Sequence, residues 1–162
     1  MPRALPGVTW WSRVSSVLAP VLLIGGWALA ASLQPGGFDP RVATISDLAA
    51  LDATDRWVMT VGIAGTGVCH LVTASGLRSA ALRGRVLLGI GGAASLLVAV
   101  FPLPAGGGTS SAHRAAAFVA FLLLTVWAPY AGSLTRRRPG VCAAGSPWRP
   151  VVSSQCSRSG SS

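Results

Sequence analysis

Four long apolar segments divide the chain, and short polar connections separate them. The segments lie at residues 14–33, 57–77, 86–103 and 115–134, and none of them contains an Asp or an Arg. A membrane-spanning helix needs about 20 mostly apolar residues, and in lipid a single helix satisfies its own backbone hydrogen bonds. Polar residues do not alternate with apolar ones at period two, which disfavours a membrane barrel. We therefore predict an all-α membrane protein, a four-transmembrane-helix bundle over residues 1–134.

The last part of the chain has a different composition. Residues 135–162 are rich in Arg, Pro and Ser and show no periodic apolar pattern. A segment of this kind buries too little apolar surface to offset the entropy that ordering costs. We predict a disordered, basic Ser/Pro-rich tail on the cytoplasmic side.

Charge supports a membrane location and indicates an orientation. The net charge is +9, all cations are Arg, and only 10% of residues are charged, compared with about 25% in soluble domains. Because the arginines lie in the connections, the charge does not indicate a nucleic-acid partner. With the N-terminus inside, ten arginines lie on the cytoplasmic side and three opposite. The positive-inside rule then predicts a cell (inner or plasma) membrane protein with both termini cytoplasmic.

The N-terminal segment allows a second interpretation. Residues 1–32 combine two arginines, an apolar run and the sequence Ala-Leu-Ala at 28–30, which resembles a signal-peptide cleavage site. Cleavage there would remove the first helix and place the new N-terminus outside.

The first polar connection, residues 34–56, contains all four aspartates of the chain. Thr44 and Asp47 have the spacing of a capping box, which predicts a short amphipathic helix over residues 45–51, lying along the outer membrane surface. Asp52 or Thr54 is then expected to cap the second membrane helix. The glycine triplet at 106–108 lacks phosphate-loop spacing and predicts a flexible connection.

His70 is an ionisable residue inside the second apolar segment, and such residues are functional candidates by default. At 3.6 residues per turn it shares a face with Gly62, Thr66, Cys69 and Thr73, and this small, weakly polar face is expected to point into the bundle. Two interpretations stay open. His70 is either a structural residue hydrogen-bonded to a neighbouring helix, or the ligand- or proton-handling group of a small transporter subunit.

His113 precedes the fourth apolar segment, and the predicted topology puts it on the same side as Ser46 and Asp47. These residue types are those of a Ser–His–Asp relay, so Ser46, Asp47 and His113 are candidate catalytic residues of a membrane-embedded lipid hydrolase, with Asp39 as an alternative carboxylate. No nucleophile-elbow pattern accompanies them. The alternative is that His113 is an interfacial residue that caps a helix or forms a salt bridge, and that the aspartates are caps and solvated loop charges.

The sequence predicts neither a cofactor nor a metal site. The two histidines are expected at different depths, which is poor geometry for a shared haem, and a catalytic zinc needs three protein ligands. Cysteine spacing indicates no zinc site or disulfide framework. The expected partners are membrane lipids, with a membrane-protein partner or a second copy of the chain as further possibilities.

Several short motifs, taken in order, resemble a bacterial multi-pass membrane family, domain of unknown function 998. The resemblance covers about residues 10–134 and implies a membrane protein that normally has six helices and no established activity. Because three arginines stand at 136–138, this chain departs from that pattern and resembles a truncated form without the last two helices. We expect a structural, lipid-contacting or partner-binding role. The motifs are Phe38-Asp39-Pro40, Thr44-Ile45-Ser46-Asp47-Leu48-Ala49, Arg56-Trp57-Val58-Met59-Thr60, Gly67, Ala74 to Arg78, Gly91-Gly92, Phe101-Pro102 and His113.

Overall fold

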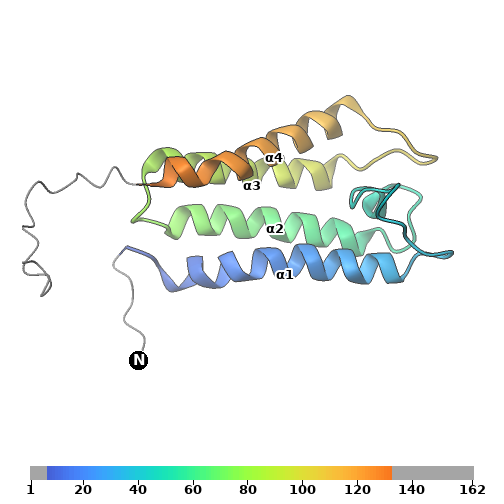
Figure 1. Cartoon of the computed structure of the whole chain (residues 1–162), viewed down its shortest axis with the longest axis horizontal. Helices are drawn as coiled ribbons and strands as arrows, with labels where there is room; N and C mark the ends of the chain where they lie inside the picture. Colours follow the sequence, from blue (N-terminus) through green and yellow to red (C-terminus); the bar gives the residue numbers. More distant parts are fainter. Residues whose placement is uncertain (1–6, 133–162) are drawn as a thin grey trace, which may run out of the picture.

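A computed structural model describes residues 7–132, and in this part of the chain four long helices run up and down beside one another (Figure 1). All four are long and apolar enough to cross a membrane, which confirms the predicted all-α membrane bundle. The predicted tail at 135–162 lies outside the described residues. The elements are α1 (Trp10–Ser32), a short 3₁₀ helix η1 (Asp47–Ala49), α2 (Trp57–Gly76), α3 (Leu82–Val100) and α4 (Ser111–Ala131).

The bundle has two distinct ends. The loop end is formed by the connections at 33–56 and 101–110, and the terminal end by the start of α1 and the end of α4. At the loop end, α4 begins four residues before the predicted span, so that His113 lies in its first turn. At the terminal end, α3 begins at Leu82 and contains Arg85. The guanidinium of Arg85 donates to the carbonyl oxygens of Ala74 (2.8 Å) and Ser75 (3.1 Å), which are free because α2 ends there.

Glycines allow adjacent helices to approach closely. A Cβ atom added to Gly26 of α1 would lie 3.3 Å from the Cα of Gly62 on α2. Between α2 and α3, a Cβ added to Gly67 would lie 2.7 Å from the carbonyl oxygen of Gly92. A side chain at Gly67 would force the backbone apart, and one at Gly26 would require its neighbour to give way by a few tenths of an ångström. Close backbone approach at small residues is how membrane helices gain packing energy without a hydrophobic driving force.

Buried hydroxyl groups also join α1 to α2. The hydroxyls of Ser15 and Thr73 lie 2.8 Å apart and are both buried. Farther along, the Thr66 hydroxyl contacts the carbonyl oxygen of Ala19 across the interface (3.2 Å) and that of Gly62 in its own helix (2.8 Å). A polar group without a partner is costly in lipid, so these bonds favour one register of α1 on α2.

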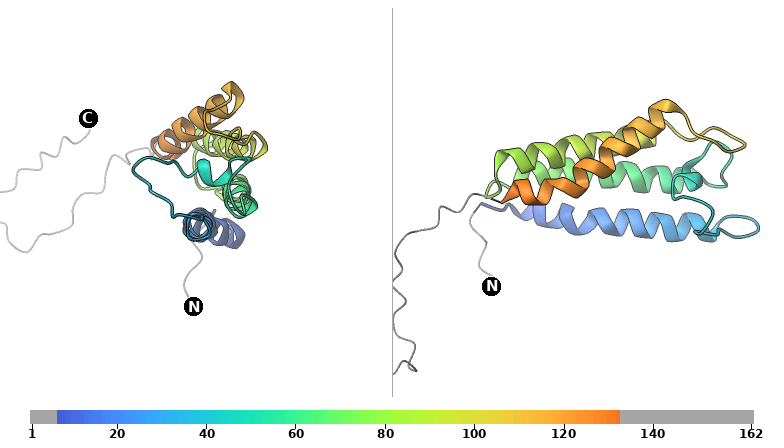
Figure 2. Two further views of the ribbon diagram at one scale, coloured as in Figure 1. Left: turned by 90° about the vertical axis from the view of Figure 1, so that its right-hand side faces the viewer. Right: turned by 45° about the horizontal axis from the view of Figure 1, so that its top comes forward.

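The four helices follow an arc in chain order and do not close into a ring (Figure 2). The extensive interfaces join α1 to α2, α2 to α3 and α3 to α4, whereas α1 and α4 have no comparable interface with each other. In their most apolar stretches, only 17% of α1 and 11% of α4 is buried, against 50% of α2. One side of the bundle, between α1 and α4, is therefore open.

The helix predicted over residues 45–51 is wrong. The structure has the three-residue 3₁₀ helix η1, and Leu48 is only 1% exposed. Leu48 and Ala49 belong to the core cluster that contains Ala30 of α1 and Met59 of α2. This segment turns inward and covers the core at the loop end instead of lying along a membrane surface. Burying Leu48 is more favourable than extending a short exposed helix, whose nucleation is costly.

Only part of the predicted capping is present. One carboxylate oxygen of Asp47 accepts the backbone N–H of Thr44 (2.6 Å) and also its hydroxyl (2.8 Å), which is one half of a capping box. The predicted cap of α2 is wrong, because the N-cap residue is Arg56 and no side chain caps it. Asp52 instead accepts the N–H of Gly106 at 2.7 Å.

The two loop-end connections are held together. Besides the bond from Gly106 to Asp52, the N–H of Leu51 donates to the carbonyl oxygen of Leu103 at 3.0 Å. Gly106, Gly107 and Gly108 all have φ between +79° and +90°, a backbone conformation that glycine adopts without steric cost. The glycine triplet thus shapes a turn that brings the second connection against the first.

Candidate functional site

Three adjacent cavities follow the open side of the bundle, and together we call them the cleft. The central chamber has a volume of about 140 Å³. The terminal-end chamber, of about 290 Å³, shares Leu23, Thr66 and His70 with it. The loop-end chamber, of about 390 Å³, shares Ser46 and Phe121, among others, with the central chamber. Because the central chamber shares lining residues with each of the other two, the three form one row. The central and terminal-end chambers lie between α1 and α4, whereas the two loop-end connections and α4 line the loop-end chamber.

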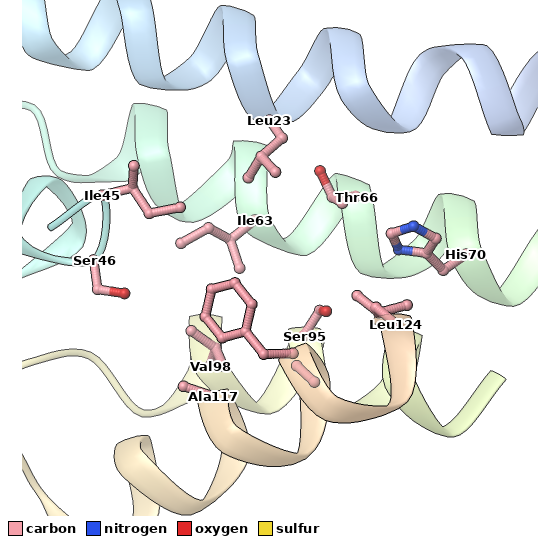
Figure 3. A pocket seen from close by; sticks show the side chains of 12 residues that line it. Leu23, Ile45, Ser46, Ile63, Thr66, His70, Ser95, Val98, Ala117 and Leu124 are labelled. Atoms are coloured by element: carbon pink, nitrogen blue, oxygen red, sulfur yellow. The ribbon is translucent and has the colours of Figure 1, made fainter. Parts of the chain in front are cut away.

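The wall of the central chamber is mainly apolar (Figure 3). Its few hydroxyls include those of Thr66 and Ser95, which already donate to backbone carbonyls of their own helices. A concave, apolar space with few free polar groups suits an apolar ligand. The lining residues are Leu23, Ile45, Ser46, Ile63, Thr66, His70, Ser95, Val98, Ala117, Ala120, Phe121 and Leu124.

His70 lies at the junction of the central and terminal-end chambers. Figure 3 shows it at the opposite end of the central chamber from Ser46. As predicted, its helix face turns inward, because Gly62, Thr66 and Thr73 are all buried. The Nδ1 atom of His70 is buried and has no hydrogen-bond partner in the described part of the chain. A transporter site at His70 would be supported by a broken helix beside this residue, but α2 is continuous through it.

The loop-end chamber brings the candidate catalytic residues together. Ser46 and Asp47 come from the first connection, and His113 comes from α4. The predicted topology put these residues on the same side, and the bond between Leu51 and Leu103 joins the two connections that carry the chamber. The complete lining is Thr44, Ile45, Ser46, Asp47, Leu103, Gly108, Thr109, His113, Ala117 and Phe121.

His113 is held in one orientation. Its backbone N–H donates to the Ser110 hydroxyl (3.1 Å), so Ser110 is the helix cap and His113 is the capped residue. Its ring is buried, and Nδ1 lies 2.7 Å from the carbonyl oxygen of Phe101. A carbonyl only accepts, so Nδ1 carries the proton, and in the neutral ring Nε2 is left as an acceptor. This tautomer is assigned from the partner atom.

The hydrogen bonds of a Ser–His–Asp relay are absent from the described part of the chain. Within residues 7–132, no hydrogen bond joins Ser46, Asp47 and His113 to one another, although they line one chamber. The carbonyl of Phe101 occupies the position behind the imidazole that a carboxylate has in the relay. Asp39 accepts the N–H of Arg41 at 2.9 Å and does not line the chamber. The catalytic assignment of these residues stays a prediction.

Sequence reasoning missed several functional parts of the cleft. Phe121 and Trp127 line it, but an aromatic residue in a membrane helix gives no sign of facing a cavity. The role of Phe101 had a usable signal, because Pro102 follows it. A proline ends a helix, and the carbonyls of the last turn then need partners outside the helix.

Potential metal ligands are not grouped together in the described residues. In the part of the chain that the structure describes, no three or more His, Cys, Asp or Glu side chains lie close enough to hold a metal ion. His70 and His113 line different chambers.

The fold and the cleft define a multi-pass membrane protein with an open helical bundle. The chain matches the family model described as "Protein of unknown function (DUF998)" over residues 17–152, which is most of its length. It belongs to the DUF998 family, as the resemblance indicated, and the matched range extends beyond the residues that carried the resemblance. No curated protein and no solved structure gave a match.

Proposed function

We propose that this protein binds a membrane lipid and holds one of its acyl chains in the cleft between α1 and α4. The observation that carries the proposal is the row of three chambers on the side where α1 and α4 do not pack together. In a bilayer this side faces acyl chains and not water. A lipid can therefore enter the cleft laterally.

The length of the cleft fits this ligand. From His113 to Trp127 it follows α4 over fourteen residue-to-residue steps, or about 21 Å at about 1.5 Å per step. One leaflet of the hydrocarbon core is about 15 Å thick. An acyl chain moves from one apolar medium to another, so burial in the cleft gains little from the hydrophobic effect. Affinity instead comes from dispersion contacts with the chamber walls and from the headgroup.

Filling the cleft tests the proposal. Ala117 borders both the central and the loop-end chamber, whereas Ala115, two residues earlier on α4, is exposed. Native mass spectrometry of the purified full chain should show co-purified phospholipid in the wild type and in Ala115→Phe. Ala117→Phe should lose it. Equal lipid content in the two variants, or a wild type without lipid, would overturn the proposal.

A second candidate function is cleavage of an ester bond in the bound lipid. It is favoured by the tautomer of His113, because Nε2 is then an acceptor on a residue that lines the same chamber as Ser46. A general base must lie within hydrogen-bond reach of the hydroxyl, so this function requires that the bound lipid bring Ser46 and His113 together. The test is release of fatty acid from a labelled phospholipid by the purified protein. Release that Ser46→Ala abolishes supports this function. A wild type without release, or Ser46→Ala with unchanged release, excludes it.

We also propose that the protein lies in the cell (inner or plasma) membrane with both termini in the cytoplasm. The support is the excess of arginine in the two chain termini and around the connection between α2 and α3, compared with the loop end. In a background with Cys142 and Cys156 replaced by serine, Val42→Cys at the loop end should react with an impermeant maleimide in intact cells. Ser79→Cys, at the terminal end, should react only after lysis. If Ser79→Cys reacts in intact cells and Val42→Cys reacts only after lysis, the loop end faces the cytoplasm and the proposed orientation is wrong.

A further inference from the structure

We infer that the loop-end chamber selects lipids by their headgroup and prefers an ammonium group with N–H donors, as in phosphatidylethanolamine, over an anionic headgroup. The inference rests on the proposed lipid-binding function and names the ligand class. It is carried by the arrangement of acceptor atoms at the loop end of the cleft.

The first observation concerns the hydrogen-bonding groups that face the chamber. Thr44 occupies one carboxylate oxygen of Asp47 with two hydrogen bonds, and no described residue donates to the other oxygen. The Nδ1–H group of His113 is bonded to Phe101, so Nε2 of the neutral ring is an acceptor without a donor among residues 7–132. Asp47 and His113 both line the chamber, and each has an acceptor atom that no described residue occupies.

The second observation concerns charge. The chamber lining contains the carboxylate of Asp47 and no arginine. The loop end as a whole has four aspartates against Arg41, Arg56 and Arg114, and none of these three arginines lines the chamber. A phosphate-only headgroup would meet a carboxylate without a neighbouring cation. An ammonium group supplies both the positive charge and the donors, and such charge-assisted bonds are stronger than neutral ones.

The third observation concerns position. The chamber adjoins the apolar central chamber through shared walls at Ile45, Ser46, Ala117 and Phe121. A lipid whose chain occupies the central chamber therefore has its polar end at the loop end of the same cleft. Headgroup and chain sites are continuous, so the headgroup decides which lipid the chain site holds.

The test compares three lipids with identical acyl chains in native mass spectrometry of the detergent-solubilised full chain. Phosphatidylethanolamine should bind about tenfold more tightly than phosphatidylglycerol, a ratio that corresponds to one good interaction. Phosphatidylcholine has the positive charge but no N–H donors, and should bind at least about threefold more weakly than phosphatidylethanolamine. Equal or tighter binding of phosphatidylglycerol would overturn the inference.

A matched pair of variants locates the selectivity. Asp47→Asn keeps an amide oxygen for Thr44 but removes the charge, and it should reduce the preference to less than about twofold. Asp39→Asn makes the same change outside the chamber and should keep the preference. A preference that survives in Asp47→Asn would overturn the inference, and if this variant does not fold, the wild-type comparison still decides. If all three lipids bind with equal affinity, headgroup selection is refuted but the proposed lipid binding is not. If no lipid binds, the proposed function itself is refuted.

Discussion

The imidazole Nδ1 of His113 lies 2.7 Å from the carbonyl oxygen of Phe101, and this contact joins the first turn of α4 to the end of α3. The chain reverses between these two residues through the segment that contains the glycine triplet. A buried side chain thus pairs with a helix-end carbonyl and also lines the loop-end chamber. The same residue therefore holds two helices together and forms part of the cleft wall.

We predict that His113→Ala destabilises the fold by about 1–3 kcal/mol, because it removes a buried side chain and leaves the part-buried Phe101 carbonyl without its partner. Ser110→Ala removes the helix cap and should cost about 1 kcal/mol. Denaturant titration in detergent micelles measures both. If His113→Ala is as stable as the wild type, the contact between His113 and Phe101 does not stabilise the fold.

We predict that Gly67→Ala is strongly destabilising, because a Cβ atom there would lie 2.7 Å from the backbone oxygen of Gly92 and must push α2 and α3 apart. Gly89→Ala is the control on α3, since its Cβ would meet only the Ala74 side chain at 3.8 Å. The control should be neutral or stabilising by up to about 1 kcal/mol from helix propensity. The measurement is the midpoint temperature of thermal denaturation of each variant. Equal midpoints for Gly67→Ala and Gly89→Ala would contradict the close crossing of α2 and α3.

We predict that Ser15 and Thr73 are coupled. A double-mutant cycle with Ser15→Ala and Thr73→Ala should give an interaction energy near about 0.6 kcal/mol and below about 1.7 kcal/mol, the range for hydrogen bonds between membrane helices. Unfolding in mixed micelles measures the four stabilities. Strict additivity would mean that the 2.8 Å contact contributes nothing to holding α1 on α2.

We predict that His70→Leu is neutral or stabilising. The Nδ1 atom of His70 is buried without a partner in the described residues, and a buried polar group without a hydrogen bond is costly. An apolar side chain of similar size removes that cost and leaves the chamber wall apolar. The measurement is the unfolding free energy in detergent. A decrease of more than about 2 kcal/mol in the unfolding free energy would instead indicate that His70 makes a structural hydrogen bond. A decrease of that size is expected when a buried partner is left unpaired.

The sequence by itself determined that the described part of the chain, residues 7–132, is an all-α bundle of four helices able to span a membrane. Length and the exclusion of Asp and Arg are sufficient for that conclusion, because the cost of placing charge in lipid does not depend on how helices pack. It also indicated the inward face of α2, since small residues at helical spacing mark a close interface. The topology placed Ser46, Asp47 and His113 at one end of the bundle.

Only the tertiary structure decided what lies between the helices. Leu48 is buried because α1, α2 and η1 meet at the loop end, and the local pattern around it predicted a surface helix. The sequence also could not predict the open side between α1 and α4, because a helix face that contacts lipid and one that contacts another helix are both apolar. Which ring nitrogen of His113 is left as an acceptor depends on the Phe101 carbonyl, a backbone group whose position follows from the whole fold.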